Sequence, residues 1–171
     1  SDSDARVYDT RKTTPGWRQL EKYAVGCGGG MNHRSGLYEA VLIKDNHLAF
    51  GKARMESSAF GVAEAVKLAR QFTQELSPQP IVEIEVDDLD QLAEALPSGP
   101  DIVLLDNMPA ETLSKAVALR DEVSPDVQLE ASGGITIDNI GKIAASGVDR
   151  ISIGALTHAG RWMDVGLDWL D

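Results

Sequence analysis

The sequence predicts an α/β fold with about six parallel strands, and three observations support this. The chain has 171 residues, the size of a single domain. Short β-branched runs alternate with longer segments of helical periodicity, the pattern of βα units. Apolar residues make up 43% and charged residues 25% of the chain, as in ordinary globular proteins. This alternation fits a doubly wound open sheet or most of a (β/α) barrel.

The predicted strands are short runs rich in β-branched and other apolar residues. We expect them near residues 5–11, 40–46, 81–86, 102–106, 127–131 and 150–154. The segments between them have helical patterns, and we expect helices near residues 16–26, 56–76, 88–96, 110–123 and 136–145. The helical period is clear in the second of these, because Val62, Val66 and Ala69 recur every three or four positions.

Residues typical of helix ends support several of these boundaries. Asp88 is a suitable N-cap for the helix at 88–96, and Thr136 for the helix at 136–145. Gly147 suits the left-handed conformation that follows many helices, so we expect it to end the latter helix. Cys27 has no metal-ligand spacing and is interpreted as a small buried apolar residue.

Composition argues against several classes of protein. The net charge of −11 and the pI near 4.6 disfavour non-specific binding to nucleic acids or anionic membranes. No apolar run in the sequence approaches the roughly 20 residues of a membrane span. One cysteine cannot form an internal disulfide, and no signal-peptide pattern opens the given chain, so a cytoplasmic location is expected. We interpret residues 1–4 as a disordered or cloning-derived tail and residues 5–171 as the folded domain.

Charge is unevenly distributed along the chain. Residues 1–54 contain nine basic and six acidic residues, whereas residues 55–171 contain seven basic and twenty-one acidic ones. The first third of the chain is therefore expected to carry a cationic site on an acidic body. The alternative is a chance fluctuation of surface charge.

Polar or glycine-rich motifs lie at the carboxyl end of every predicted strand. In chain order they are Asp9-Thr10-Arg11-Lys12-Thr13-Thr14-Pro15-Gly16, Lys44-Asp45-Asn46-His47, Glu83-Ile84-Glu85, Asp106-Asn107, Glu130-Ala131-Ser132-Gly133-Gly134 and Gly154-Ala155-Leu156-Thr157-His158. Parallel strands bring their carboxyl ends to one rim, where barrel enzymes place their active sites. We therefore expect these motifs to form one site.

Basic side chains in the first third of the chain are candidates for binding a substrate with several carboxylates or phosphates. They are Arg11, Lys12, Arg34 and Lys44, together with His33 and His47. Lys44 directly follows a buried strand, so its charge is expected to have a partner. Taken singly, each could instead be a solvated surface group.

Two further groups of residues at strand ends suggest specific chemistry. Ser132-Gly133-Gly134 precedes a predicted helix, so its amides could bind a phosphate together with Gly154-Ala155; the alternative is a pair of glycine turns. Glu85 and Asp106 end neighbouring strands and could hold Mg²⁺ or sugar hydroxyls, or act as general acid and base. The alternative for these carboxylates is hydrogen bonding to loop amides.

Seven segments, in order, closely resemble quinolinate phosphoribosyltransferases, the carboxylating nicotinate-nucleotide pyrophosphorylases. They are DTRKTTPG (9–16), GGGMNHR (28–34), LIKDNH (42–47), EIEVD (83–87), LLDN (104–107), EASGG (130–134) and GALTH (154–158). The resemblance covers nearly the whole chain and implies an incomplete, TIM-like barrel. It also implies transfer of phosphoribosyl from phosphoribosyl pyrophosphate to quinolinate, with release of CO₂ and pyrophosphate, giving nicotinate mononucleotide for NAD biosynthesis.

The resemblance also implies the roles of individual residues. Lys12, Lys44, Glu85 and Asp106 would be catalytic, and the last two would lie near Mg²⁺, bound directly or indirectly. Arg11, His33, Arg34 and Lys44 would bind the two carboxylates of quinolinate, and Lys12 the phosphoribosyl pyrophosphate. The substrate-binding set as a whole would be Arg11, Lys12, His33, Arg34, Lys44, Glu85, Asp106, Ser132, Gly133, Gly134, Gly154 and Ala155.

The sequence departs from the family pattern at two points. The N-terminal domain of the family, which covers the active site of the partner in a homodimer, is absent from these 171 residues, so this chain alone is expected to be inactive. Gly26 stands where a basic residue is expected. Two other functions remain open: a paralogue that uses another acid as acceptor, and a non-catalytic anion-binding module.

Overall fold

The structure, a computed structural model, describes residues 3–55, 60–161 and 163–169. Its strands are β1 (Arg6–Tyr8), β2 (Ala40–Ile43), β3 (Ile81–Val86), β4 (Ile102–Asp106), β5 (Gln128–Ser132) and β6 (Arg150–Ser152). Its helices are α1 (Arg18–Cys27), α2 (Asp45–Arg54), α3 (Val62–Thr73), α4 (Leu89–Ala95), the 3₁₀ turn η1 (Leu96–Ser98), α5 (Ala110–Val123), α6 (Ile140–Ala144) and α7 (Ala155–His158).

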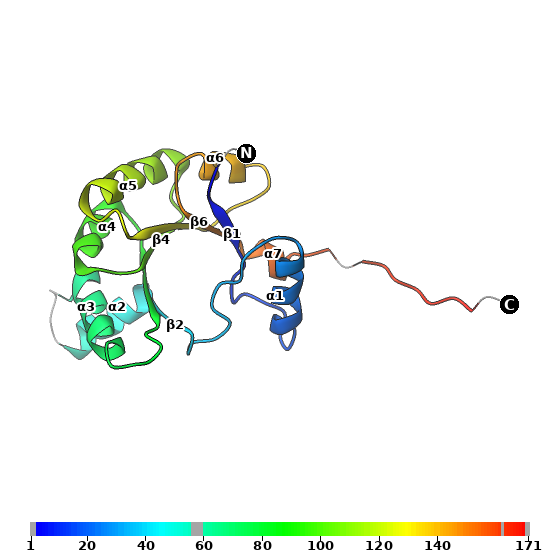
Figure 1. The fold of residues 1–171 in the computed structure, drawn as a ribbon, viewed down its shortest axis with the longest axis horizontal. Helices are drawn as coiled ribbons and strands as arrows, with labels where there is room; N and C mark the ends of the chain where they lie inside the picture. Colours follow the sequence, from blue (N-terminus) through cyan, green and yellow to red (C-terminus); the bar gives the residue numbers. More distant parts are fainter. Residues whose placement is uncertain (1–2, 56–59, 162, 170–171) are drawn as a thin grey trace.

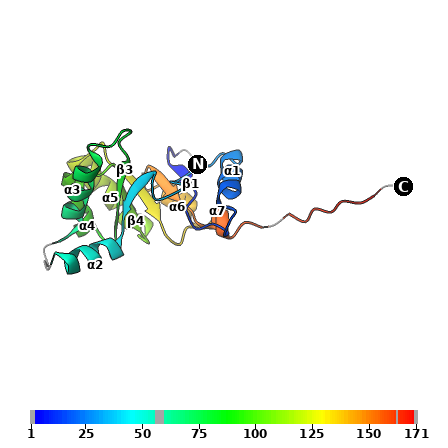
Figure 2. The ribbon, with the colours of Figure 1, turned by 90° about the horizontal axis from the view of Figure 1, so that it is seen from below.

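The six strands form one parallel sheet in the order β1-β6-β5-β4-β3-β2. Sequential strands are therefore neighbours from β2 to β6, and β1 pairs with β6, as in a barrel left open between β1 and β2. Helices α3 to α6 surround the outside of this curved sheet, and α1 and α7 lie side by side near its β1 edge (Figures 1 and 2). The predicted α/β fold, an open TIM-like barrel of six strands, is confirmed.

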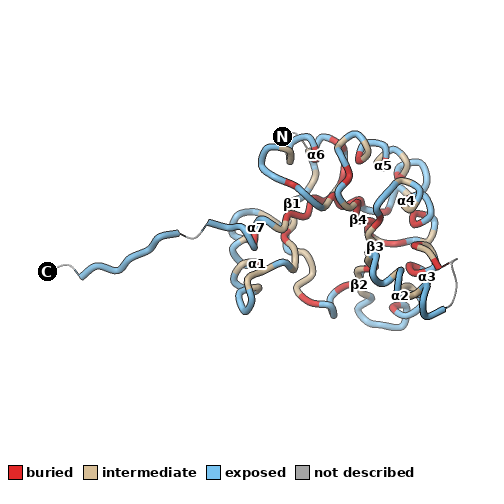
Figure 3. The backbone as a smooth tube through the Cα atoms, turned by 180° about the vertical axis from the view of Figure 1, so that it is seen from behind, coloured by how far each residue is buried: buried red, intermediate tan, exposed pale blue. Residues whose placement is uncertain are grey.

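The core lies between the sheet and the outer helices. Alternate strand residues such as Val82, Ile84 and Leu105 are fully buried in one apolar cluster with residues of α3, α4 and α5. Because side chains alternate across a strand, the intervening residues point to the concave side of the sheet, which we call the inner face. The strands are the most buried part of the chain, and residues 163–169 are exposed and extend away from the barrel (Figure 3).

The first two strands are shorter than predicted. The strand expected at 5–11 covers Arg6–Tyr8, and the second ends early because helix α2 was not anticipated. The expected strand at 40–46 ends at Ile43, and Asp45 already begins α2. Lys44 is the N-cap residue, and its backbone N–H donates to His47 Nδ1 at 2.9 Å. Asp45 in the first turn and basic residues in the last turn complement the helix dipole. This polar helix has no buried residue, so the sequence lacks the apolar stripe that identifies most helices.

Several predicted helix boundaries and one predicted burial are corrected by the structure. The helix expected at 56–76 runs over Val62–Thr73, and residues 56–59 lie outside the described residues. The helix expected at 136–145 begins only at Ile140, because Thr136 forms a turn in which its N–H donates to Asn139 Oδ1 at 2.8 Å. Cys27, predicted to be buried, is exposed at the end of α1.

Two predicted helix-end residues are confirmed. The Asp88 carboxylate accepts from the Gln91 N–H at 2.8 Å and caps α4. Gly147, three residues beyond the last residue of α6, has φ of 92°, the left-handed conformation that glycine adopts at little cost. Across the described part of the chain, none of the helices combines the length and apolar character needed to cross a bilayer.

Arg120 on α5 carries a charge buried between the helix layer and the sheet, and its removal is expected to destabilise the fold. Its guanidinium donates to Val127 O at 2.6 Å and to Asp149 Oδ2 at 2.7 Å. We expect Arg120→Met to lower the free energy of unfolding by about 1–3 kcal/mol, because Asp149 and a buried carbonyl lose their donor. Urea denaturation measures this, with the exposed Lys115→Met on the same helix as control; equal stability of the two variants would contradict the prediction.

Candidate active site

The carboxyl ends of the strands form a rim that carries several of the predicted site residues. Glu85 on β3 and Asp106 on β4 are on neighbouring strands, and Asp106 is in register with Ser132 on β5. Lys44, which follows β2, forms an ion pair with Glu85 through Nζ and Oε2. The partner expected for Lys44 is therefore the Glu85 carboxylate. Because the Glu85 side chain is only 12% exposed, its negative charge in turn requires a nearby cation.

Arg11 and Arg34 bring two guanidinium groups together. The pKa of Arg34 is lowered, first by burial and then by the nearby positive charge of Arg11, while Glu83 acts in the opposite direction. One Arg34 nitrogen, Nη1, donates to Ala40 O at 2.8 Å. Arg11 Nε is buried and has no hydrogen-bond partner. A buried donor without a partner, beside a second cation, is suited to an anionic ligand.

A buried ion pair fixes the segment that carries Arg34. Asp9, which follows β1, is fully buried and pairs with Lys22 of α1. The same Asp9 oxygen accepts from the His33 N–H at 2.9 Å, and Lys22 Nζ donates to His33 O at 2.7 Å. Lys22 is not identifiable from the sequence as part of the site, because a basic residue on a helix usually belongs to the solvated face.

A second buried polar group lies on the inner face; Glu83 and Glu130 belong to the strand-end motifs expected to form the site, but the sequence indicated no role for either of them or for Arg150. Glu83 and Glu130 are 1% and 0% exposed. Arg150 Nε donates to Glu130 Oε2 at 2.6 Å and its guanidinium stacks on Tyr8, 3.8 Å from the ring centre. The sequence does contain a signal for Glu83. Glu83 and Glu85 alternate with apolar residues in β3, so both side chains are expected on the same side of the sheet.

The His33 ring links this group to the rim. Its Nε2 lies 3.2 Å from Glu83 Oε2 and 3.3 Å from Glu130 Oε1. Burial lowers its pKa, but Glu130 and Glu83 outweigh burial and raise the pKa to about 9. A second contact opposes a charged ring, because the Arg34 N–H donates to Nδ1 at 2.8 Å and can do so only if Nδ1 carries no proton. A pKa of about 9 corresponds to a charged ring at neutral pH, whereas the Arg34 contact requires Nδ1 to be unprotonated. Burial also raises the pKa of the adjacent Glu83, which reduces the negative charge that favours a second proton on the ring. The direct contact therefore assigns a neutral ring with its proton on Nε2.

The glycine loop after β5 packs tightly against the loop after β4. Gly133 has φ of 91°, and a Cβ there would lie 2.2 Å from Asn107 Oδ1. Asn107 N–H in turn donates to Ser132 O at 2.8 Å. The expected helix directly after Ser132-Gly133-Gly134 is not present, because α6 begins at Ile140 and has five residues. A phosphate at this loop would therefore meet loop amides and not a helix N-terminus.

The loop after β6 meets the loop after β1. Thr157 Oγ1 donates to Lys12 O at 2.6 Å, and a Cβ on Gly154 would lie 3.5 Å from Thr10 Oγ1. Lys12 therefore lies beside the second glycine-containing loop, Gly154-Ala155. His47, one of the candidate cations, caps α2 locally. The predicted residues thus converge on the rim and the adjoining inner face.

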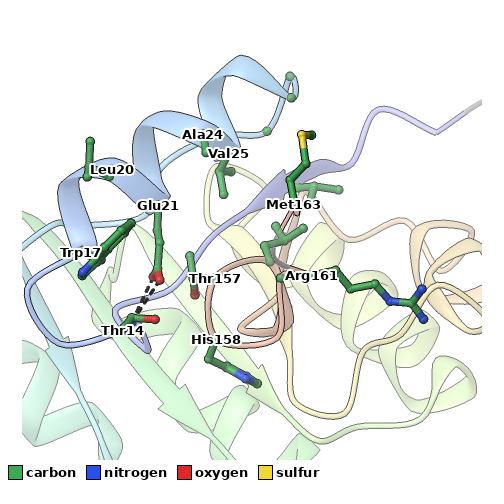
Figure 4. Close-up of a pocket in the computed structure, with 16 residues that line it drawn as sticks. Thr14, Trp17, Leu20, Glu21, Ala24, Val25, Thr157, His158, Arg161 and Met163 are labelled. Carbon is green, nitrogen blue, oxygen red and sulfur yellow. Dashed lines mark hydrogen bonds between the residues drawn. The ribbon is translucent and has the colours of Figure 1, made fainter. Parts of the chain in front are cut away.

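A larger, mainly apolar cavity lies elsewhere. It has a volume of about 730 Å³ and lies between α1 and α7, lined by residues that include Trp17, Leu20 and Met163 (Figure 4). None of the residues predicted to be catalytic or to bind substrate lines it, although Thr14 and Leu156, Thr157 and His158 of the strand-end motifs do. A smaller cavity of about 310 Å³ on the inner face is lined by residues that include Arg34, Glu83 and Arg150. The lining of this smaller cavity also includes Ala40, Ile81 and Ile102, the first residues of β2, β3 and β4. The site at the carboxyl rim is therefore assigned from its charged side chains and not from a cavity.

Fold and site together define an open (β/α) barrel domain whose carboxyl rim carries basic side chains, carboxylates and glycine loops, the place where barrel enzymes have their active sites. Residues 1–168 match the family model described as quinolinate phosphoribosyl transferase, C-terminal domain. The chain belongs to this family.

Known relatives agree with this assignment. The chain is 45% identical to a carboxylating nicotinate-nucleotide pyrophosphorylase of Mycobacterium leprae, over 96% of this chain and 54% of the relative. It is 40% identical to the human protein of that name, over 94% of this chain and 50% of the relative. The solved nicotinate-nucleotide pyrophosphorylase from Francisella tularensis superposes with a TM-score of 0.77 at 44% identity, covering 91% of this chain and 50% of that one. The chain thus spans about half the length of these relatives.

Proposed function

We propose that this chain is the barrel domain of an enzyme that transfers phosphoribosyl from phosphoribosyl pyrophosphate to quinolinate, with loss of CO₂ and pyrophosphate. The product would be nicotinate mononucleotide, a precursor of NAD. The observation that carries the proposal is the buried, unpartnered Arg11 Nε beside Arg34. Together with Lys44 these groups supply the cations that an acceptor with two carboxylates requires. Family membership supports the same reaction.

The arrangement of charges suits the proposed chemistry. The transition state of ribosyl transfer is cationic at the sugar and anionic at the departing pyrophosphate. Glu85 and Asp106 would stabilise the sugar cation, and Lys12 the leaving group. After transfer, the ring nitrogen of the acceptor is itself cationic and can stabilise the carbanion that remains when the adjacent carboxylate leaves as CO₂. The chain would therefore act mainly by positioning and by charge.

The proposal includes Mg²⁺, for which the donor chemistry is suitable. Glu85 and Asp106 offer carboxylate oxygens, the ligands that Mg²⁺ prefers. Lys44 occupies one oxygen of Glu85, and the Asn107 side chain donates to Asp106 Oδ2 at 2.8 Å, so both carboxylates keep a second oxygen. When bound, the ion would neutralise charge on the pyrophosphate group. We further propose that the active form is a homodimer or larger homo-oligomer of the full-length enzyme and that it is cytoplasmic.

The acceptor assignment predicts a preference for quinolinate over nicotinate. Quinolinate presents two carboxylates and nicotinate one, so we expect at least about tenfold tighter binding of quinolinate by calorimetry, because one charge-assisted contact contributes 1.5–3 kcal/mol. Arg11→Ala should remove most of that difference. Arg70→Ala is the control, since Arg70 pairs with Asp101 away from the rim.

Two other results would redirect the assignment. Equal affinity for nicotinate and quinolinate would favour a paralogue that uses another acid. Binding of inorganic phosphate without pyrophosphate release by the protein in its encoded length would favour a non-catalytic anion-binding module.

A further inference from the structure

We propose that Glu83, Glu130 and Arg150 form a buried network that holds His33 and, through His33, positions Arg34 for its ligand. In this assignment His33 is a positioning residue and does not itself contact the substrate. The inference rests on the proposed function only in that the ligand of Arg34 is taken to be a pyridine dicarboxylate.

The network lies one layer below the rim on the inner face. Glu83 precedes Glu85 by two residues on β3 and therefore points to the same side of the sheet. Glu130 is in register with Arg150 on the adjacent strand β6, and their side chains form a buried ion pair. Two carboxylates this deeply buried require compensating donors. Arg150 supplies one, to Glu130 Oε2. His33 Nε2 lies 3.2 Å from Glu83 Oε2 and 3.3 Å from Glu130 Oε1, close polar contacts beside Glu83 Oε1 and Glu130 Oε1, which have no hydrogen-bond partner.

Both nitrogens of His33 are engaged within the protein. Nε2 faces the two carboxylates, and Nδ1 accepts from the backbone N–H of Arg34. No ring nitrogen is then free to bind a ligand. The ring instead connects the buried network to the backbone of Arg34. At the end of the Arg34 side chain, the guanidinium donates a hydrogen bond to Ala40 O. The direction in which Arg34 faces Arg11 therefore depends on this chain of contacts.

The same side chains could be taken for a metal site, and the hydrogen bonds argue against that. Ligand atoms of His33, Glu83 and Glu130 lie within 4.8 Å of one another. A histidine that binds a metal through one nitrogen usually donates from the other, whereas Nδ1 of His33 is an acceptor. The proton must then be on Nε2, between the two carboxylates, where a metal ion would have to displace it. A positioning network fits these contacts and a metal site does not.

The test is a double-mutant cycle on quinolinate affinity. Glu130→Gln removes the negative charge that pairs with Arg150 and faces His33 Nε2. We expect this variant to raise the Kd of quinolinate about tenfold. Arg34→Lys keeps the charge of Arg34 but not its planar fork. If Glu130 acts through Arg34, adding Glu130→Gln to Arg34→Lys should change the Kd less than twofold. If Glu130→Gln raises the Kd by the same factor in the wild-type protein and in Arg34→Lys, the proposal is overturned. A general loss of folding would produce this result, because it would affect both proteins equally.

A second variant and a ligand-free measurement complete the test. His33→Asn keeps an acceptor for the Arg34 N–H, but its shorter side chain cannot place the amide N–H at the position of Nε2 beside Glu83 and Glu130. It replaces Glu130→Gln in the cycle if that variant does not fold. Arg120→Gln, a buried-charge variant on the outer layer, is the matched control and should leave the Kd unchanged. Hydrogen exchange at the Arg34 amide should accelerate about tenfold in Glu130→Gln and not in Arg120→Gln.

The outcomes separate the two proposals. Unchanged exchange at Arg34 in Glu130→Gln would overturn the positioning role whatever the affinity. If the unaltered chain binds no quinolinate, the proposed function fails, and the exchange result alone decides the role of the network.

Discussion

Replacing Lys44 by alanine is expected to lower kcat/KM for nicotinate mononucleotide formation by about 100-fold or more. Lys44 is the cation paired with Glu85, whose carboxylate is almost buried. Its removal takes a positive charge from the rim and leaves that carboxylate without its partner. A 100-fold loss corresponds to about 2.7 kcal/mol, the contribution of one or two charge-assisted contacts. Steady-state assay of the protein in its encoded length measures the effect. Glu85→Ala should show a loss of similar size.

Lys52→Ala is the matched control for this prediction. Lys52 is an exposed lysine in the last turn of α2, so its loss should change kcat/KM less than twofold. Wild-type kcat/KM in both Lys44→Ala and Glu85→Ala would show that this part of the rim is not the active site.

Gly133→Ala should weaken binding of phosphoribosyl pyrophosphate by about 100-fold, because it displaces the loop proposed to hold the 5-phosphate. An alanine at φ of 91° is strained by about 1–2 kcal/mol, and its Cβ would lie 2.2 Å from Asn107 Oδ1. Relief of this overlap requires the loop after β5 or the one after β4 to move. Each charge-assisted amide contact then lost contributes about 1.5–3 kcal/mol, and two such losses account for the expected factor. Calorimetric titration measures the Kd.

Gly141→Ala separates loop geometry from the general effect of an added methyl group. Gly141 is in α6 and a Cβ there would meet nothing within 4 Å. Alanine favours helix over glycine by about 1 kcal/mol, so this variant should be at least as stable as the original and bind normally. Equal Kd values for Gly133→Ala and the unaltered protein would exclude Gly133 from the phosphate site.

The sequence was sufficient to predict the strands and the rim. Buried parallel strands are nearly continuous apolar runs, so β3 and β4 were located to the residue. Polar residues at the carboxyl ends of such strands must meet at one edge, which placed Lys44, Glu85 and Asp106 together. Helix α2 was missed because all its side chains face solvent to some extent, and a helix without a buried stripe has no periodic signal.

Only the tertiary structure identified which partners the charged side chains have. Local sequence determines which way Glu83 and Glu130 point, since side chains alternate along a strand. It does not determine that His33, fifty residues before Glu83, inserts its ring between them, or that Asp9 pairs with Lys22. The free energy of a buried charge depends on atoms within a few ångströms of it, and those atoms come from distant parts of the chain. The sequence by itself thus determined the fold class and the rim at which the candidate residues meet, and the packing of the strands decided which residues contact them.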